Sequence, residues 1–318
     1  MRHRRLHNRI AESELTFPIC ALLAILSWGW QAWRMAAGYE ALAWLGGGLL
    51  MALLVAYVVM ETNNTFQLIR VRTRWVAGTW LLLASAFPFM HAAGAPLLLT
   101  AIMAICYNLT FHCYQLPKSA PQYFYITLLL SAGSILHPLM LAFLPAFFFY
   151  IIVLMRSMSL RTLVAGLAGI LLPYLLWGAW QFLSDDLSPL FMHYQRISGW
   201  TLPHAEDYRQ LSVRQIISWS IIGFYTLVGL LHYWRTNYND KIRTRMMLYV
   251  FAWQTILLHG LLALLPRCYT TLMALMFVSV PPLFIHYLAL SSNRFSVLIF
   301  FVSILSYLLL LYANLWMP

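Results

Sequence analysis

Residues 122–155 read QYFYITLLLSAGSILHPLMLAFLPAFFFYIIVLM and contain no charged side chain. A transmembrane helix needs about 20 mostly apolar residues to cross roughly 30 Å of hydrocarbon, so this stretch is too long for one span. Proline cannot continue the hydrogen-bond ladder of a helix. We therefore predict two helices that meet at His137–Pro138. The apolar runs are continuous, which indicates helices and not the alternating strands of a membrane barrel.

The rest of the chain has the same character. Of its 318 residues, 62% are apolar and 9% are charged, and the mean hydropathy is +0.74. A soluble domain carries about 25% charged residues. This composition excludes a soluble enzyme, a disordered chain and a small disulfide scaffold. We expect an all-α polytopic transmembrane bundle that forms a single integral membrane domain over residues 1–318, with a basic cytoplasmic segment at 1–15.

Eleven stretches are long and apolar enough to cross a bilayer, within a range of ten to twelve. They are 16–35, 40–60, 75–91, 94–113, 122–137, 138–155, 162–183, 214–234, 246–266, 269–290 and 296–316.

The distribution of basic residues tests this map. Short cytoplasmic loops of membrane proteins are enriched in Lys and Arg. With the N-terminus inside and the C-terminus outside, the inner segments hold fifteen basic residues and the outer segments five. Treating 122–155 as one span would place Arg156 and Arg161 outside and would shift every later loop to the wrong side. The charges therefore support eleven spans in a bacterial inner membrane.

This sidedness also accounts for the net charge of +11. We expect membrane lipids as partners, with a lipid-linked substrate or other membrane proteins as further candidates, and no nucleic acid, because the basic residues lie in short loops. His112, His232 and His286 fall near predicted inner helix ends, but their spacing does not predict a metal or haem site. We expect no metal and no cofactor, and a phosphate-binding loop, a metalloprotease helix and a nucleophile elbow are absent from the sequence.

None of the nine carboxylates falls in the middle of a predicted span. Proton-coupled transporters usually keep ionisable residues inside the bundle, so this distribution argues against a proton-driven pump. A carrier that uses the backbone of broken helices stays open, with Pro145, Pro173 and Pro281–Pro282 as candidate breaks.

The segment 184–213 is the one long loop, and the map places it outside. Apolar residues recur in it at helical spacing, which predicts a short helix lying in the membrane interface. Acid–base groups beside such a helix would suit a lipid-linked substrate, with a carboxylate or His as base and Arg on a phosphate. The candidate catalytic residues are Asp185 and Asp186, and the candidate binding residues are His193, Arg196, His204 and Arg209. The alternative is a solvated connector in which Asp185 or Asp186 caps the helix.

Two resemblances add to this reading. Residues 63–89 (NNTFQLIRVRTRWVAGTWLLLASAFPF) and 131–177 (SAGSILHPLMLAFLPAFFFYIIVLMRSMSLRTLVAGLAGILLPYLLW) resemble an uncharacterised Bacteroidetes family of multi-pass inner-membrane proteins. The second stretch is also similar to the membrane core of glycosyltransferase C superfamily enzymes, which use polyprenyl-phosphate-linked sugars. That resemblance implies a catalytic carboxylate in the first outer loop, where this chain has only Glu40.

Three hypotheses follow for the activity. The first is a component of envelope or lipid-linked glycan biogenesis without a catalytic role. The second is a glycosyltransferase-C-like enzyme that acts at the outer leaflet through Glu40 or the Asp185–Asp186 pair. The third is a carrier for a lipid or a neutral solute. The sequence leaves open whether the protein is an enzyme.

Overall fold

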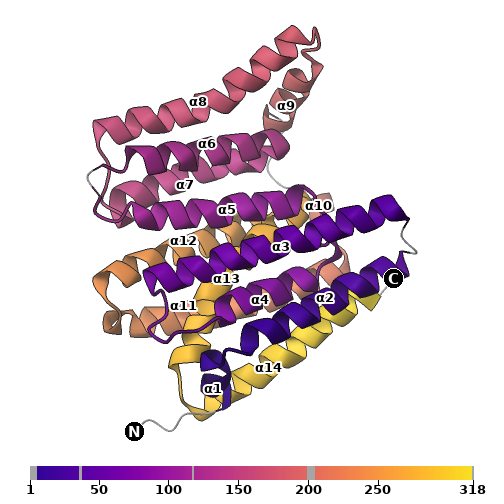
Figure 1. Cartoon of the computed structure of the whole chain (residues 1–318), viewed down its shortest axis with the longest axis vertical. Helices are drawn as coiled ribbons and strands as arrows, with labels where there is room; N and C mark the ends of the chain where they lie inside the picture. Colours follow the sequence, from indigo (N-terminus) through magenta and orange to yellow (C-terminus); the bar gives the residue numbers. More distant parts are fainter. Residues whose placement is uncertain (1–5, 36–37, 117, 199–204, 317–318) are drawn as a thin grey trace. The chain divides into compact units, whose positions relative to one another are not determined.

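The structure is a computed structural model that describes residues 6–35, 38–116, 118–198 and 205–316. Every regular element within these ranges is helical (Figure 1). The chain divides into two compact units, the first formed by 1–101 with 204–318 and the second by 102–203.

The first unit is built around α13 (Tyr269–Leu290), whose side chains are almost all buried. The helices that pack on α13 are α1 (Leu6–Glu12), α4 (Trp75–Ser85), α11 (Val213–Thr236) and α12 (Ile242–Leu264), and α2 (Thr16–Arg34), α3 (Tyr39–Phe66) and α14 (Arg294–Leu311) complete the unit. Short helical turns extend or join them: η1 (Pro88–Met90), α10 (Ala205–Arg209), η4 (Asn237–Asn239), η5 (Pro266–Cys268) and the π-helical η6 (Tyr312–Trp316). A helix that is apolar on all sides belongs in the centre of a bundle, and α13 has this character.

One end of the first unit gathers the connections that the sequence predicts to be cytoplasmic. The α3–α4 loop pairs with the α11–α12 connection through Arg70 and Asp240. The α1 helix covers the carboxyl end of α13, where Asn8 Nδ2 donates to the carbonyls of Ala289 and Ser291 at 3.1 and 3.0 Å. These bonds satisfy carbonyl groups that the last turn of a helix leaves without partners.

Connections predicted to be outside gather at the other end of this unit. Arg34, the last residue of α2, donates to the carbonyl of Leu315 near the end of the described residues. The indole of Trp28 donates to the carbonyl of His91, in the connection after α4, at 2.9 Å. Arg267 pairs with Asp207 at 2.6 Å. Within this unit, the chain therefore alternates between two ends in the order that the sequence predicts.

The second unit contains most of α5 (Ala95–His112), which begins in the first unit, together with α6 (Ala120–Leu136) and α8 (Leu160–Leu183). Between α6 and α8 lie η2 (Pro138–Ala142), α7 (Phe143–Phe149) and the π-helical η3 (Tyr150–Leu154), and α9 (Ser188–Ser198) follows α8. The chain turns at His137, whose backbone is extended, and then returns. The amide of Gln115 donates to the carbonyl of Met155 at 2.8 Å, so the returning segment reaches the level at which α5 ended. The predicted break at His137–Pro138 is confirmed.

Seven described helices are long and apolar enough to cross a membrane: α3, α5, α8, α11 with η4, α12, α13 with η5, and α14 with η6. The pair α1 and α2 passes the same test as one bent element with an angle of 85°. The other predicted spans are shorter here, since α4 has 11 residues, α6 has 17, and 138–154 is divided among three helical types. The predicted span 75–91 ends early as a helix because Pro88 disfavours helical backbone at Phe87.

The other candidate breaks are not breaks in the structure. Pro281 and Pro282 lie inside α13, Pro173 lies inside α8 and Pro145 lies inside α7. Helices in membranes tolerate proline where neighbouring groups satisfy the freed carbonyls.

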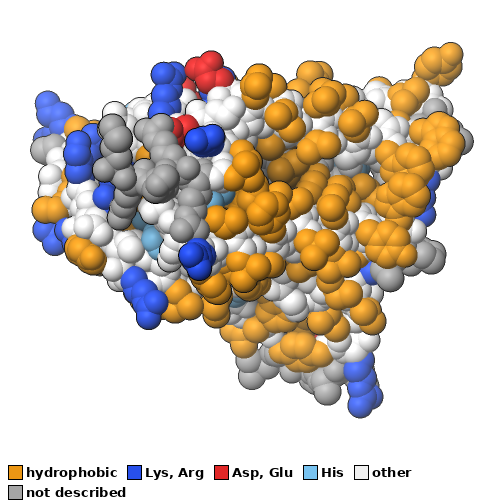
Figure 2. Space-filling model, turned by 90° about the horizontal axis from the view of Figure 1, so that it is seen from below, with side chains coloured by type: hydrophobic (Ala, Val, Ile, Leu, Met, Phe, Trp, Pro, Cys, Tyr) orange, Lys and Arg blue, Asp and Glu red, His pale blue; other side chains and the backbone are white. Residues whose placement is uncertain are grey.

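Apolar side chains cover much of the molecular surface. Figure 2 shows them across the middle of one face, with Lys and Arg side chains mainly toward its edges. In α8, for example, Leu160, Leu167, Leu171 and Leu175 are all more than half exposed. Monomeric soluble proteins rarely expose apolar patches of this extent, whereas lipid-facing helices do so as a rule.

Candidate functional site

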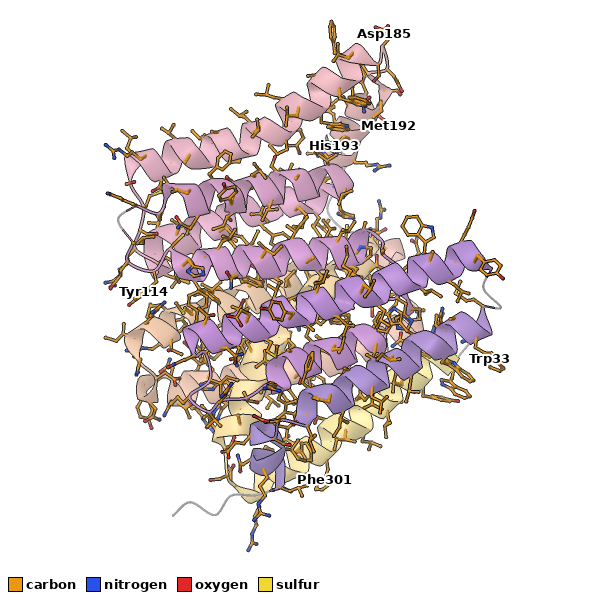
Figure 3. The ribbon with its side chains drawn as sticks, viewed as in Figure 1. Trp33, Tyr114, Asp185, Met192, His193 and Phe301 are labelled. Atoms are coloured by element: carbon orange, nitrogen blue, oxygen red, sulfur yellow. The ribbon has the colours of Figure 1, made fainter. Side chains whose placement is uncertain are left out.

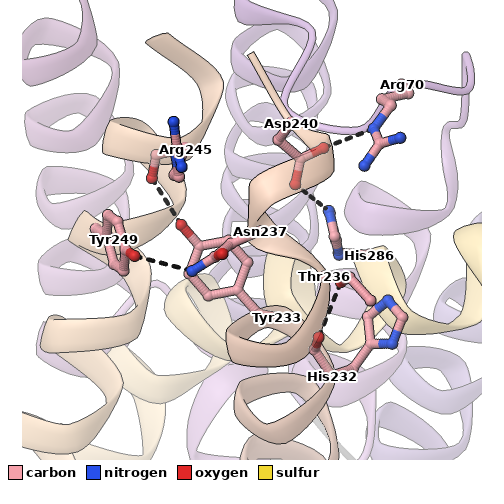
Figure 4. A network of polar contacts seen from close by, with 9 residues as sticks. All are labelled: Arg70, His232, Tyr233, Thr236, Asn237, Asp240, Arg245, Tyr249 and His286. Carbon is pink, nitrogen blue, oxygen red and sulfur yellow. Dashed lines mark hydrogen bonds and ion pairs between the residues drawn. The ribbon is translucent and has the colours of Figure 1, made fainter. Parts of the chain in front are cut away.

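A buried ionic cluster lies at the end of the first unit where the predicted cytoplasmic loops meet (Figure 4). The Asp240 carboxylate has no solvent exposure. Its Oδ1 atom accepts a hydrogen bond from Arg70 Nε at 2.6 Å, and its Oδ2 atom accepts one from His286 Nε2 at 3.1 Å. The cluster therefore joins the α3–α4 loop, the α11–α12 connection and α13.

The local sequence fixes both connections. After α3, Gln67 takes a left-handed backbone conformation that ends the helix, and Asn63 Nδ2 donates to the carbonyl of Thr73 at 3.0 Å. On the other side, Tyr233 donates to the carbonyl of Arg245 at 2.8 Å, and Asn237 Nδ2 donates to the Tyr249 hydroxyl at 2.9 Å. These bonds join the end of α11 to the start of α12 and set the position of Asp240.

The charges of the cluster favour an ionised carboxylate. Burial alone raises the pKa of Asp240, but hydrogen bonds from His286 and Arg70 outweigh it and hold this pKa below the ordinary value. A carboxylate without these donors would be costly to bury. Because an ionised carboxylate only accepts hydrogen bonds, Nε2 of His286 carries the hydrogen in this arrangement.

A second histidine stands beside the pair. The ring centroids of His232 and His286 are 5.5 Å apart, and the Tyr287 ring is 5.1 Å from that of His232. Within the described ranges, neither His286 Nδ1 nor His232 Nε2 has a hydrogen-bond partner. Ionisable residues within a membrane bundle are usually functional.

Sequence reasoning did not find this cluster. Asp240 lies in a connection between two helices, as predicted, but the sequence pattern counts it among the carboxylates outside the bundle. The basic residue and the histidine that meet it lie 170 and 46 positions away in the chain. The one available signal was that His232 and His286 both fall near predicted inner helix ends.

The segment 184–213 contains a short helix, α9, which belongs to the second unit. Asp186 Oδ1 accepts hydrogen bonds from the amide and the hydroxyl of Ser188 at 3.0 and 2.5 Å. These bonds lower the pKa of Asp186. Asp186 thus caps the first turn of α9, as the connector alternative predicts, and Asp185 is exposed with a positive φ of 50°.

The α9 helix turns its histidine inward and its apolar side chains outward. His193 is buried, and its Nε2 atom lies 3.1 Å from the Tyr174 hydroxyl of α8. Phe191, Met192 and Tyr194 are each more than half exposed. Figure 3 shows Met192 and His193 together on α9, with Asp185 near the end of α8. Burial and the nearby Arg196 lower the pKa of His193, which favours the neutral ring.

The remaining candidates lie elsewhere. Glu40 is an exposed residue in the first turn of α3, and Arg209 is the exposed last residue of α10; both belong to the first unit. His204 lies outside the described residues. Of the candidates, Asp186, His193 and Arg196 follow one another along one short segment, and Arg196 lies near enough to His193 to lower its pKa. Among the residues that the structure describes, no group of three or more His, Cys, Asp or Glu could hold a metal ion.

The helices and their exposed apolar faces define an all-helical, multi-pass membrane protein. No protein-family model, curated protein or solved structure matches the chain.

Proposed function

We propose that the protein is a component of envelope or lipid-linked glycan biogenesis that contacts a phosphate-bearing lipid through α9. The observation that carries this proposal is the outward apolar face of α9 beside an exposed Arg196, with His193 turned into the protein. A short helix with this distribution suits the membrane interface. Its apolar side chains would contact acyl or prenyl chains, and the guanidinium would contact a phosphate.

The proposed location is a bacterial inner membrane, with the eleven predicted segments crossing it, the N-terminus inside and the C-terminus outside. The grouping of connections at two ends of the first unit supports this topology. The fifteen-to-five distribution of basic residues supplies the orientation. In this arrangement α9 faces the outer leaflet.

A binding experiment tests the role of α9. The purified protein is titrated with a polyprenyl phosphate and, separately, with the matching polyprenol, and thermal unfolding is followed. We expect the phosphate to stabilise the protein and Arg196→Gln to weaken its binding by about tenfold, since the charge-assisted bond is lost. Arg161→Gln is the matched control, because Arg161 is exposed near the start of α8. Equal stabilisation by the polyprenol, or equal binding by both variants, would contradict the proposal.

A second candidate function is a glycosyltransferase-C-like enzyme at the same surface. It is favoured by the lowered pKa of His193 next to Arg196, because an uncharged imidazole acts as a base and a guanidinium binds a phosphate. His193→Gln keeps a hydrogen-bonding side chain toward Tyr174 but removes the base, and Asp186→Asn keeps a capping side chain but removes the carboxylate. If the protein is an enzyme, at least one of four variants should abolish its cellular phenotype without lowering protein abundance. The four variants are His193→Gln, Asp186→Asn, Glu40→Gln and Asp185→Asn. Full function in all four would exclude the enzyme and leave the non-catalytic component.

A further inference from the structure

A chain of buried polar side chains connects the interior of the second unit to α9. The Ser134 hydroxyl of α6 donates to the backbone carbonyl of Ser131 at 2.6 Å. The Tyr174 hydroxyl of α8 lies 2.6 Å from Ser134 Oγ, and Nε2 of His193 in α9 lies 3.1 Å from the Tyr174 hydroxyl. Ser134 and His193 are buried, so their hydrogen bonds are made within the protein.

The direction of each hydrogen bond in this chain follows from the first one. A backbone carbonyl only accepts, so the single hydroxyl hydrogen of Ser134 is used on Ser131. Tyr174 is then the donor to Ser134, and its own single hydrogen is used there. The Tyr174 oxygen therefore accepts from His193, which requires a hydrogen on Nε2. In a neutral imidazole the other nitrogen, Nδ1, then carries the lone pair.

This lone pair is not used within the described part of the protein. Among the described residues, Nδ1 of His193 takes part in no hydrogen bond. The rings of Tyr174 and Trp177 lie 5.8 and 5.3 Å from the imidazole centroid, so packing holds the orientation of the ring. Burial, and then the charge of Arg196, lower the pKa of His193 and disfavour a proton on Nδ1. His193 therefore carries one fixed hydrogen-bond acceptor.

A cationic side chain lies beside this acceptor. Arg196 follows His193 by three residues, which places both on the same side of α9. The guanidinium is close enough to act on the charge of the histidine, and the Arg196 residue is exposed. The Asp186 carboxylate of this segment is occupied by the amide and hydroxyl of Ser188. The segment thus combines one cationic donor with one neutral acceptor.

The monoanion of a phosphate monoester has the complementary groups. Its charged oxygens accept hydrogen bonds from a guanidinium, and its P–O–H group donates one. The second pKa of a phosphate monoester is about 6, so the monoanion is well populated at mildly acidic pH. A phosphodiester keeps one negative charge but has no P–O–H group. A site that hydrogen-bonds a hydroxyl rejects the analogue that lacks it, because the acceptor is then left without a partner.

We propose that Nδ1 of His193 selects lipid phosphate monoesters over diesters by accepting the hydrogen bond of the P–O–H group, while Arg196 binds the charged oxygens. Tyr174 and Ser134 are positioning residues, because they hold the ring hydrogen on Nε2 and do not contact the ligand. The choice of ligand rests on the proposed function of α9, whereas the position of the ring hydrogen does not.

Nitrogen NMR on the purified full-length protein with isotopically labelled histidine tests the position of this hydrogen. The signals of His193 are identified by their loss in His193→Gln, and we expect a protonated Nε2 and an unprotonated Nδ1. Ser134→Ala removes the acceptor of Tyr174, whose hydrogen then turns to Nε2, so the two nitrogens should exchange protonation states. Ser131→Ala is the matched control, because it removes a hydroxyl that donates to Ile170 but keeps the carbonyl that Ser134 uses. A wild-type ring protonated on Nδ1, or the same exchange in Ser131→Ala, overturns the proposal.

Binding measurements test the selectivity. Polyprenyl phosphate and its monomethyl ester are titrated at about pH 6, where the monoanion of the first is abundant. We expect the wild type and Ser131→Ala to bind the monoester about tenfold more tightly, since one hydrogen bond is gained. Ser134→Ala should bind both compounds equally, because Nδ1 then donates to either. Equal binding by the wild type, with both compounds weakened by Arg196→Gln, overturns this selectivity but leaves the proposed function. Binding of neither compound overturns both.

Discussion

Asp240 accepts a hydrogen bond from Arg70 at 2.6 Å across 170 residues of sequence, and this bond ties the α11–α12 connection to the α3–α4 loop. The second carboxylate oxygen binds His286, so one side chain holds three parts of the first unit together. A buried carboxylate with two donors fixes geometry more than it adds stability, because desolvation offsets much of the attraction. Removing a fully buried member is costly, since it leaves a buried polar group without its partner.

Asp240→Ala should lower the free energy of unfolding by about 2–3 kcal/mol, because His286 loses its acceptor inside the protein. Arg70→Ala should cost about 1 kcal/mol or less, because Arg70 is half exposed and its pair is screened by water. Thermal or denaturant unfolding of the purified variants measures both. Glu14→Ala, at an exposed position, is the control. If Asp240→Ala lowers the free energy of unfolding by no more than the control does, the cluster has no role in stability.

The cluster should also make stability depend on pH at the acidic end. The pKa of Asp240 in the folded protein lies below its ordinary value of 3.8. A depressed carboxyl pKa contributes stability that is fully present above the ordinary pKa and is lost as pH falls through the folded value. The unfolding temperature of the wild type should therefore fall more steeply below about pH 4 than that of Asp240→Asn. Parallel pH profiles of the two proteins would show that Asp240 is not held ionised.

Features with a local cause could be predicted from the sequence. Pro138 alone determines that the helix ends before it, and the apolar spacing in 187–197 predicts α9. Features that arise from tertiary packing could not be predicted in this way. The inward position of His193 depends on Tyr174, and the burial of Asp240 depends on residues from two other segments. Apolar patterns identify segments that enter the bundle but do not specify which polar residues of the connections are buried with them.

Gly48 should tolerate no side chain. The backbone carbonyl of His91 occupies the position that a β-carbon on Gly48 would take, and backbone cannot move as a flexible side chain can. Gly48→Ala should therefore cost about 1–3 kcal/mol of unfolding free energy, as other overpacked sites do. Gly46, two residues earlier in α3, has no atom within 4 Å of such a β-carbon. Gly46→Ala should be neutral or stabilising by up to about 1 kcal/mol, since alanine favours the helix. Equal unfolding temperatures for the two variants would contradict this packing.

The turn at His137 gives the sharpest test of membrane topology. The Ser119 hydroxyl donates to the carbonyl of Ser157 at 2.8 Å, so the residues before α6 and those before α8 meet at one end of the second unit. If both intervening segments cross the membrane, reporter fusions after Ser119 and after Ser159 lie on the same side, and the basic residues predict the cytoplasm. Fusions after Arg245 should then also report the cytoplasm, and fusions within 184–213 the periplasm. A single span would instead place the fusions after Ser119 and Ser159 on opposite sides. That result would move α9 to the inner face and would remove the outer-leaflet substrate together with it.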